Sequence, residues 1–421
     1  MNIQTQIKRT AAEELLLNAF AANGDALPGD SSVKAQRKAA AEVIGRGLPT
    51  RRVESWHYTD LRRLLSNVAS FTQAEGAVAQ APLLQGATVL SVVGGKANAS
   101  ATIDGFTVAT LANALAAGKF ADRLALAGSD DTVGAINTAF VADGYAIDIA
   151  AGAEIAQPVE LQNVHAGGQV HSRFIVNAGE GAKAVIVERQ IGIGSALVSS
   201  VSELDVAEGA EILWIIVQEQ PADVDHLAQF KATIGANAKL TLFIMNVGAK
   251  LARQEVRVRM EGEHSQFHLR GANLIAGEEH SDITMVLDHL APDTYSTETI
   301  RNIVTGRADG VFQGMIRVAQ KAQKTDAKMA CNTLLLTDEG SFSTKPELEI
   351  FADDVACGHG ATVTEIEKAH LFYLMARGID EKSARGLLVK AFLAEVIEEL
   401  ENEQVIEVLE DKLNRWFEAH A

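Results

Sequence analysis

Cys357 and His359 are the two residues whose types and spacing point most directly to chemistry. They lie two positions apart within residues 343–363, STKPELEIFADDVACGHGATV. In an extended strand, side chains at i and i+2 leave from the same face, about 6–7 Å apart. The thiolate and the imidazole can therefore contact the same ligand or metal ion. Both are soft or borderline ligands, which favours iron, zinc or a sulfur species over magnesium or calcium. A closed site usually needs about four ligands, so the pair is either half of a site completed elsewhere or a structural thiol beside a hydrogen-bonded imidazole.

The composition narrows the partners and the compartment. The 421 residues carry a net charge of −18, from 37 Lys and Arg against 55 Asp and Glu, which argues against nucleic acid or an anionic membrane as the main partner. Two cysteines are too few for a disulfide framework and indicate a reducing compartment. The first residues lack the apolar stretch of a signal peptide, and no run approaches the roughly 20 apolar residues of a membrane span. A cytoplasmic location is expected.

A repeat of short apolar runs indicates the fold. Four turn triplets recur at intervals of 29, 28 and 28 residues, and each precedes an apolar run: Gly152-Ala153-Glu154, Gly181-Ala182-Lys183, Gly209-Ala210-Glu211 and Asn237-Ala238-Lys239. A fixed period in this range is typical of stacked units, and runs of about 5–8 residues rich in Val, Ile and Leu favour strands over paired helices. The pattern predicts a β-solenoid. A two-sheet sandwich would also give short strands with frequent turns and stays open at this point.

Helical regions are expected on both sides of this core. The sequence divides into an N-terminal helical region (1–85), an α/β transition segment (86–150), the β-solenoid core (151–363) and a C-terminal helical region (364–421). Residues 366–373 and the final stripe, with Val405, Leu409, Leu413 and Trp416, have helical spacing that usually indicates packing, and Asp380 is a plausible N-cap between them. We expect these helices to cover an otherwise open sheet edge.

Other candidate ligands are explained by ordinary structural roles. His264 and His268 are four residues apart, but SQFHLRG resembles a strand, where four residues span about 13 Å, so we expect polar or turn positions. Cys331 lies 26 residues before Cys357, near the repeat period, and we hypothesise that it stacks on a neighbouring rung of the solenoid.

Two long motifs resemble a known family. Residues 324–400, which contain DDVACGHGATV and FYLMARGI, and residues 47–61, GLPTRRVESWHYTDL, resemble the SufB/SufD family of the Suf iron–sulfur cluster assembly system, and its SufD branch in particular. SufB typically carries Glu where this chain has Gly360, and it has a longer N-terminal region with several cysteines. The chain departs from the common pattern at His57, usually Lys, and at Thr364, more often Gly.

The resemblance implies a function and a set of partners. It implies a mainly β protein, a right-handed parallel β-helix flanked by helices, that acts as a non-catalytic scaffold with a SufB-like subunit and a SufC-like ATPase. A transient iron–sulfur cluster would be built at the SufB–SufD interface, with His359 and Cys357 as this chain's half-site, while this chain binds no nucleotide. Four residues of the helical end match the SufC-contacting region: Ile379, Leu387, Leu388 and Phe392.

Two other functional classes, an enzyme and a structural protein, stay open. A β-helix enzyme acting on polysaccharides would want aromatic platforms, but only 5% of residues are aromatic. A self-associating structural protein would use its exposed strand edge, and a homodimer through that edge is plausible in isolation.

Overall fold

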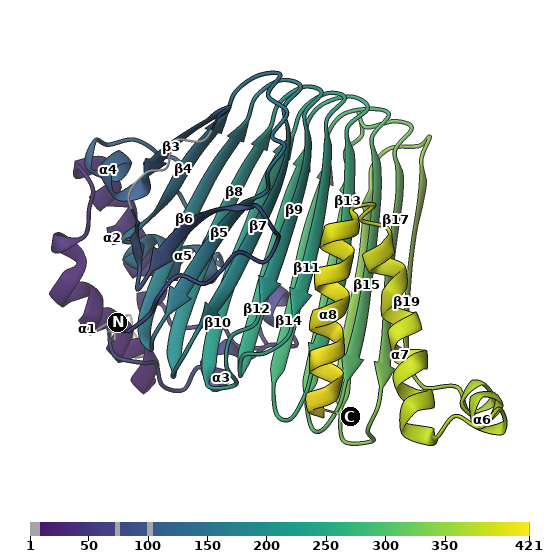
Figure 1. Cartoon of the computed structure of the whole chain (residues 1–421). Helices are drawn as coiled ribbons and strands as arrows, with labels where there is room; N and C mark the ends of the chain where they lie inside the picture. The colour runs from purple at the N-terminus through teal and green to yellow at the C-terminus, as the bar shows by residue number, and fades with distance from the viewer. Residues whose placement is uncertain (1–8, 72–75, 99–103, 421) are drawn as a thin grey trace, which may run out of the picture.

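The computed structural model describes residues 9–71, 76–98 and 104–420 (Figure 1). Its described strands form two sheets, sheet A with ten strands in the order β19-β17-β15-β13-β11-β9-β7-β5-β1-β2 and sheet B with nine in the order β18-β16-β14-β12-β10-β8-β6-β4-β3. From β4 to β19 each strand pairs in parallel with the strand two places along the chain, so the chain alternates between the sheets. The predicted β-solenoid is confirmed. The sandwich is wrong, because its sheets would be antiparallel.

The strands of the two sheets have the following bounds. Sheet A contains β1 (Thr88–Val93), β2 (Lys96–Ala97), β5 (Val159–His165), β7 (Lys183–Gly192), β9 (Glu211–Gln218), β11 (Lys239–Asn246), β13 (Gln266–Ile275), β15 (Tyr295–Val304), β17 (Asp326–Leu335) and β19 (Ala356–Glu365). Sheet B contains β3 (Phe106–Thr110), β4 (Asp143–Ile149), β6 (Gly168–Ala178), β8 (Ala196–Val206), β10 (Val224–Ile234), β12 (Leu251–Met260), β14 (His280–His289), β16 (Asp309–Val318) and β18 (Ser341–Ile350).

Helices flank the solenoid at both ends of the chain. They are α1 (Ala11–Asn23), α2 (Ser31–Gly45), α3 (Leu61–Leu64), α4 (Leu111–Ala116), α5 (Thr132–Phe140), α6 (Lys368–Ala376), α7 (Glu381–Glu398) and α8 (Glu403–His420), with short 3-10 turns at Gly24–Ala26 and Glu54–Trp56. Asp380 caps α7 as predicted, because its carboxylate accepts a hydrogen bond from the Ser383 backbone N–H at 3.0 Å.

A left-handed residue recurs at one turn of each rung. Gly152, Gly181, Gly209 and Asn237 have φ angles of 69°, 66°, 66° and 56°, and His264 continues the row at 58°. The Gly181 N–H donates to the Glu208 carbonyl and the Gly209 N–H to the Ala236 carbonyl, each at 2.9 Å, so the turns are hydrogen-bonded from rung to rung. His264 is therefore a turn residue, and His268 lies on β13.

The core consists of interior side chains stacked in register. One row joins Val159, Ile186, Trp214, Leu242 and Leu269 across β5, β7, β9, β11 and β13. All five are at most 1% exposed. Since parallel pairing repeats the same interior positions on every rung, the core is continuous along the solenoid.

The helices cover the outer faces of the sheets, and this corrects one expectation. In Figure 1, α7 and α8 lie across sheet A, where α7 packs on β13 and β15. Val405, Leu409, Leu413 and Trp416 are buried there, as the stripe predicted. The predicted covering of the sheet edge is wrong: sheet A carries outward apolar residues such as Phe243 that need a cover, so the helices pack on this face and not beside β19.

The segment 47–61 is fixed to the outer face of sheet B by buried polar contacts. The Arg253 guanidinium lies 3.7 Å from the Trp56 ring centroid and also pairs with Asp282. The Thr59 hydroxyl donates to Asp282 and lies 2.9 Å from His280 Nε2. A stacked, fully buried guanidinium with carboxylate partners holds this segment in one position.

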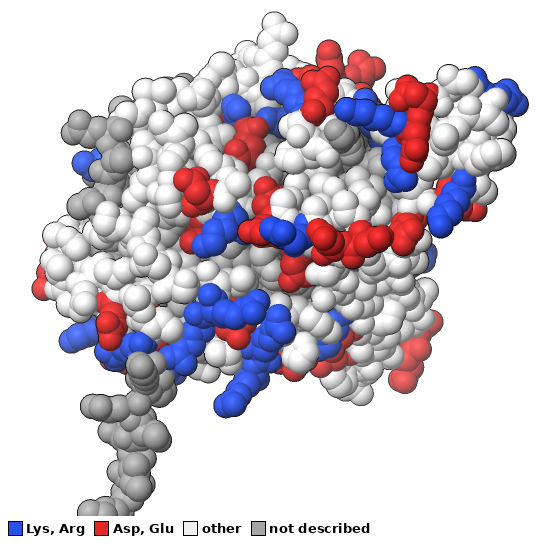
Figure 2. Space-filling model, turned by 90° about the horizontal axis from the view of Figure 1, so that it is seen from below, with Lys and Arg blue, Asp and Glu red and all other residues white. Residues whose placement is uncertain are grey.

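The described surface carries charges of both signs close to one another. Figure 2 shows acidic and basic side chains interspersed on the face seen from below. Such alternation attracts a polyanion weakly.

Within the described residues, none of the helices has the length and apolar character needed to cross a membrane.

The left-handed turn position gives a stability prediction. Gly209→Ala should lower the free energy of unfolding by about 1 kcal/mol, because φ is 66° and a Cβ there meets no atom within 4 Å, so the cost is backbone strain alone. Asn237→Gly, at the equivalent turn, is the control and should change it by only a few tenths of a kcal/mol. Urea denaturation midpoints measure both, and equal midpoints for Gly209→Ala and the unmodified chain would contradict the argument.

Candidate functional site

Cys357 and His359 lie on β19, the outermost strand of sheet A. Cys357 is opposite Ala327 and His359 is opposite Met329, and both of these β17 residues face the buried core. His359 is thus the last member of the interior row that passes through Leu269. The two predicted site residues share one face, on the final rung of the solenoid interior.

This end of the solenoid is open in the described chain. Within the described residues, β19 has β17 as its one ladder partner and β18 has β16, so each strand leaves one edge unpaired. Ile350, Phe351 and Val363 are 39%, 65% and 41% exposed. Residues that would be core on an inner rung are therefore accessible here, and Cys357 is half-buried while His359 is exposed.

The two cysteines have different environments. Cys331 is 1% exposed, and burial raises its pKa to about 12. Burial also raises the pKa of Cys357, with smaller effects from the nearby Asp326 and Glu298 charges, so this thiol is protonated at neutral pH. Cys331 lies on the neighbouring rung as predicted, but it is opposite Ala361, four residues from Cys357 in register. The sulfurs are thus separated by about 13 Å along the strand.

A buried carboxyl group belongs to the same interior row. Glu298 on β15 is opposite Leu269 on one side and Met329 on the other, with His359 beyond Met329. Burial raises the pKa of Glu298 to about 8, and this outweighs the opposite effects of the Ser296 hydroxyl and the Arg270 guanidinium. A buried carboxyl group is therefore present in this interior row, two strands of sheet A before the open end.

The four residues expected to contact a SufC-like ATPase, Ile379, Leu387, Leu388 and Phe392, lie in or just before helix α7. Leu387 is 49% exposed on α7, while Leu388 and Phe392 are half-buried and line a cavity with Val363 of β19. Phe392 also packs under the Arg301 guanidinium, 4.8 Å from its ring centroid. Ile379 lies in the bend before α7. Only Leu387 of the four presents a large exposed apolar side chain.

Sequence reasoning missed the exposure of α6. This helix buries none of its residues, and Phe372, Tyr373 and Met375 are 73%, 56% and 41% exposed. The helical spacing of residues 366–373 predicts packing, and for Tyr373, the last of them, this prediction is wrong. The sequence KAHLFYLMA has apolar residues all round the helix, which is a signal that one apolar face would remain after packing.

The described residues bring few possible metal ligands together. Among the described residues, no three or more His, Cys, Asp and Glu side chains are grouped so as to hold a metal ion. Cys357 and His359 offer one sulfur and one nitrogen, which is half of a four-ligand soft site.

Comparison with known proteins identifies similar chains. Residues 161–392 match the family model described as SUF system FeS cluster assembly, SufBD core domain. The iron-sulfur cluster assembly protein SufD of Escherichia coli is 28% identical, over 86% of this chain and 88% of its own length. An iron-sulfur cluster assembly SufBD family protein of Synechocystis is 28% identical over 88% of each chain. The iron-sulfur cluster assembly protein SufB of Bacillus subtilis is 26% identical over 66% of this chain and 61% of its own.

The two thiols should differ in reactivity. Iodoacetamide should modify Cys357 in the native protein and leave Cys331 unmodified until denaturant is added, because Cys331 is buried. The Cys357 rate should keep rising with pH beyond the ordinary thiol range, since its pKa is raised. Mass spectrometry of the labelled chain measures both, with Cys357→Ser as the control. Native labelling of Cys331 at an equal rate would contradict the geometry.

Glu298 should make stability depend on pH. Its pKa rises from 4.5 in the unfolded chain to about 8 in the folded one, so the folded state binds the extra proton and stability is lost as pH rises between these values. Glu298→Gln should raise the urea midpoint at pH 8 and flatten this slope. Glu339→Gln, at an exposed turn, is the control. Identical slopes for the unmodified chain and Glu298→Gln would refute the burial argument.

Proposed function

Because the chain belongs to the SufBD family of SUF iron–sulfur cluster assembly proteins, we propose that it is a non-catalytic scaffold that pairs with a SufB-like subunit through its open solenoid end. A nascent cluster would be the cargo of that interface, shared by the two chains and held only transiently. Family membership also favours this role over a polysaccharide-degrading β-helix enzyme.

The observation that carries the proposal is the position of Cys357 and His359 on an uncovered terminal rung. Unpaired strand edges are suited to β-augmentation, in which a second chain adds its own strand to the sheet. The exposed Phe351 and Val363 would become buried in such an interface. A partner docked there would bring its own ligands close to Cys357 and His359, which completes a site that one chain half fills.

The protonation states of Cys357 and His359 should determine how tightly this half-site binds iron. The ligand forms are a thiolate and a neutral imidazole, and the pKa of Cys357 is raised by burial in the isolated chain. A nearby cation favours the thiolate, so metal loading releases a proton from this sulfur. Assembly therefore weakens as the pH falls.

The helical end supplies a second surface, which we assign to a SufC-like ATPase. Phe372, Tyr373, Met375 and Leu387 place exposed apolar groups on α6 and the start of α7. Phe392 connects α7 to the Arg301 side chain of β15, and Leu388 lies beside Val363 of β19. A movement of α6 and α7 would therefore also shift β19, the strand that carries His359. ATP chemistry would come from the partner.

The two surfaces can be tested separately. Phe351→Asp should weaken co-purification with the SufB-like subunit at least tenfold, because it puts a charge into an apolar interface, and should leave the SufC-like ATPase bound. Phe372→Asp should have the opposite effect. Each variant is the control for the other, and loss of both partners in either one would mean that the surfaces are wrongly assigned. In isolation, a homodimer through the open edge should also be lost in Phe351→Asp.

His359 gives the sharpest test of the site. In the complex with SufB-like and SufC-like partners, His359→Ala should reduce the cluster absorbance formed from iron and sulfide about tenfold or more, while complex assembly is unchanged. His57→Ala, an exposed histidine of the N-terminal segment that lies on neither proposed partner surface, is the control. Normal cluster formation by His359→Ala would end the site assignment.

A further inference from the structure

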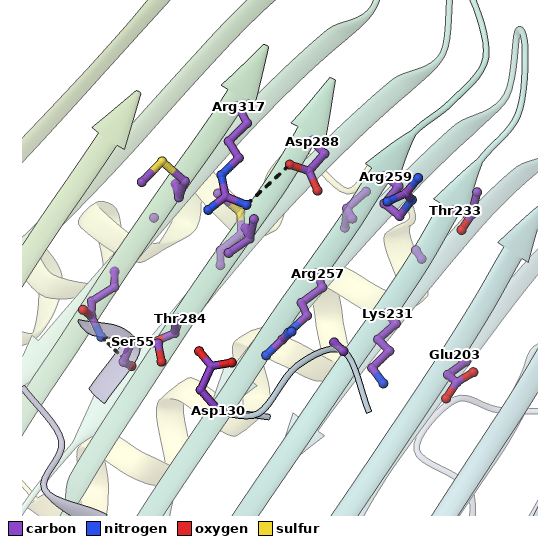
Figure 3. Close-up of a pocket in the computed structure, with 18 of the residues that line it drawn as sticks. Ser55, Asp130, Glu203, Lys231, Thr233, Arg257, Arg259, Thr284, Asp288 and Arg317 are labelled. Atoms are coloured by element: carbon purple, nitrogen blue, oxygen red, sulfur yellow. Dashed lines mark hydrogen bonds and ion pairs between the residues drawn. The ribbon is translucent and has the colours of Figure 1, made fainter. Parts of the chain in front are cut away.

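A second cavity lies far from β19 in the chain, on the outer face of sheet B (Figure 3). It has a volume of about 620 Å³, within the range of small-molecule sites of about 300–1,000 Å³. The sheet B strands β8, β10, β12, β14, β16 and β18 form its floor, while residues 54–55 and 123–130 overhang it on two sides. Neither Cys357 nor His359 lines it.

Both walls of the cavity are fixed by buried contacts. The Ser55 carbonyl accepts hydrogen bonds from Arg253 at 2.7 Å and from Gln313 at 3.3 Å. On the other side, the Asp131 carboxylate accepts from the Ala127 N–H at 2.9 Å and from Gln229 at 3.0 Å. The cavity is thus preformed, which lowers the entropic cost of binding a ligand.

Lys231 is a cation without a close counter-ion at the floor of this cavity. Among the described residues, no carboxylate oxygen is placed within 4.0 Å of its amine. Glu203, its in-register neighbour, is 3.2 Å from Arg173, and Asp131 is held 3.8 Å from Arg257. Burial is the largest cause of the lowered pKa of Lys231, and the Arg173 and Arg257 charges lower it further. The Asp131 and Glu203 carboxylates, both beyond ion-pair distance, act in the opposite direction. An anion placed beside it would be stabilised.

A row of side chains across the strands gives the cavity two chemically different ends. Lys231, Arg257, Val286 and Met315 are in register on β10, β12, β14 and β16. Figure 3 shows Lys231 and Arg257 side by side, with Asp130 beside Arg257. With about 4.8 Å between strands, the two cations are followed by an apolar strip of similar length. The row spans about 14 Å, the length of a small organic molecule.

Carboxylates close the row at both ends. Glu203 precedes Lys231 and Glu347 follows Met315 in register. Glu347 is paired with Lys345 at 3.0 Å, so this end of the row carries no unpaired charge, and the row fits one anionic group joined to a neutral apolar body. Arg257 has five donors, and its contacts with Glu255 at 3.3 Å and Asp131 at 3.8 Å both use Nη2, so its other donors can reach such a group.

We propose that this cavity binds a small phosphate monoester with an apolar ring system, whose phosphate meets Lys231 and Arg257 and whose ring lies on Val286 and Met315. This role is independent of the half-site at the open end, and it makes the chain a receptor for a small anion as well as a scaffold.

The test uses the full chain and 1-naphthyl phosphate as the probe, with binding followed by calorimetry. The probe should bind at least tenfold more tightly than either inorganic phosphate or 1-naphthol, because only the probe fills both ends of the row. Lys231→Met should weaken binding about tenfold or more, whereas Lys183→Met, an exposed lysine paired with Glu154 outside this cavity, should not.

Two further variants separate binding from folding. Lys231→Arg keeps the charge and should stay within about threefold of the unmodified chain, while Met315→Glu should abolish binding by adding a charge to the apolar strip. Thermal unfolding checks that each variant is folded. If the probe fails to bind, if 1-naphthol binds equally well, or if folded Lys231→Met and Met315→Glu keep full affinity, the proposal is overturned.

Discussion

In-register parallel stacking of the rungs is the constraint on which the rest of this structure depends. Each rung repeats the interior positions of the one before, so rows such as Trp214, Leu242 and Leu269 form a single continuous core. A stack of this kind does not close on itself as a barrel does, and its two ends need separate solutions. At the first end, β2 pairs antiparallel with β1 and β3 pairs antiparallel with β4, which stops the parallel stack in both sheets. At the other end, β18 and β19 leave the last rung uncovered in the described chain.

The same stacking explains why one residue type has two roles. Cys331 and Cys357 lie on neighbouring strands with side chains toward the interior, but one rung separates a buried, inert thiol from an accessible one. Glu298 is fully buried on β15, two strands of sheet A before β19, and burial raises its pKa. Position along the stack therefore decides chemistry that residue type alone leaves open.

The outer faces of the solenoid are used differently from its end. Sheet A is covered by α7 and α8, and the exposed helix α6 connects the last strand, β19, to α7. Sheet B is partly covered by the N-terminal segment, and the buried Arg253 with its Trp56 and Asp282 contacts fixes that segment in place. The overhang it forms creates the cavity around Lys231, so a contact that stabilises the fold also shapes a candidate binding surface.

The sequence alone determined the solenoid, the helix cap at Asp380 and the pairing of Cys357 with His359 on one strand face, because local periodicity, turn chemistry and i, i+2 spacing act within a few residues. Only the tertiary structure decided that the helices cover a sheet face and not an edge, that Tyr373 is exposed, and that Lys231 and Met315 share one cavity. These outcomes depend on which surfaces meet across many rungs, and local spacing carries no information about that choice.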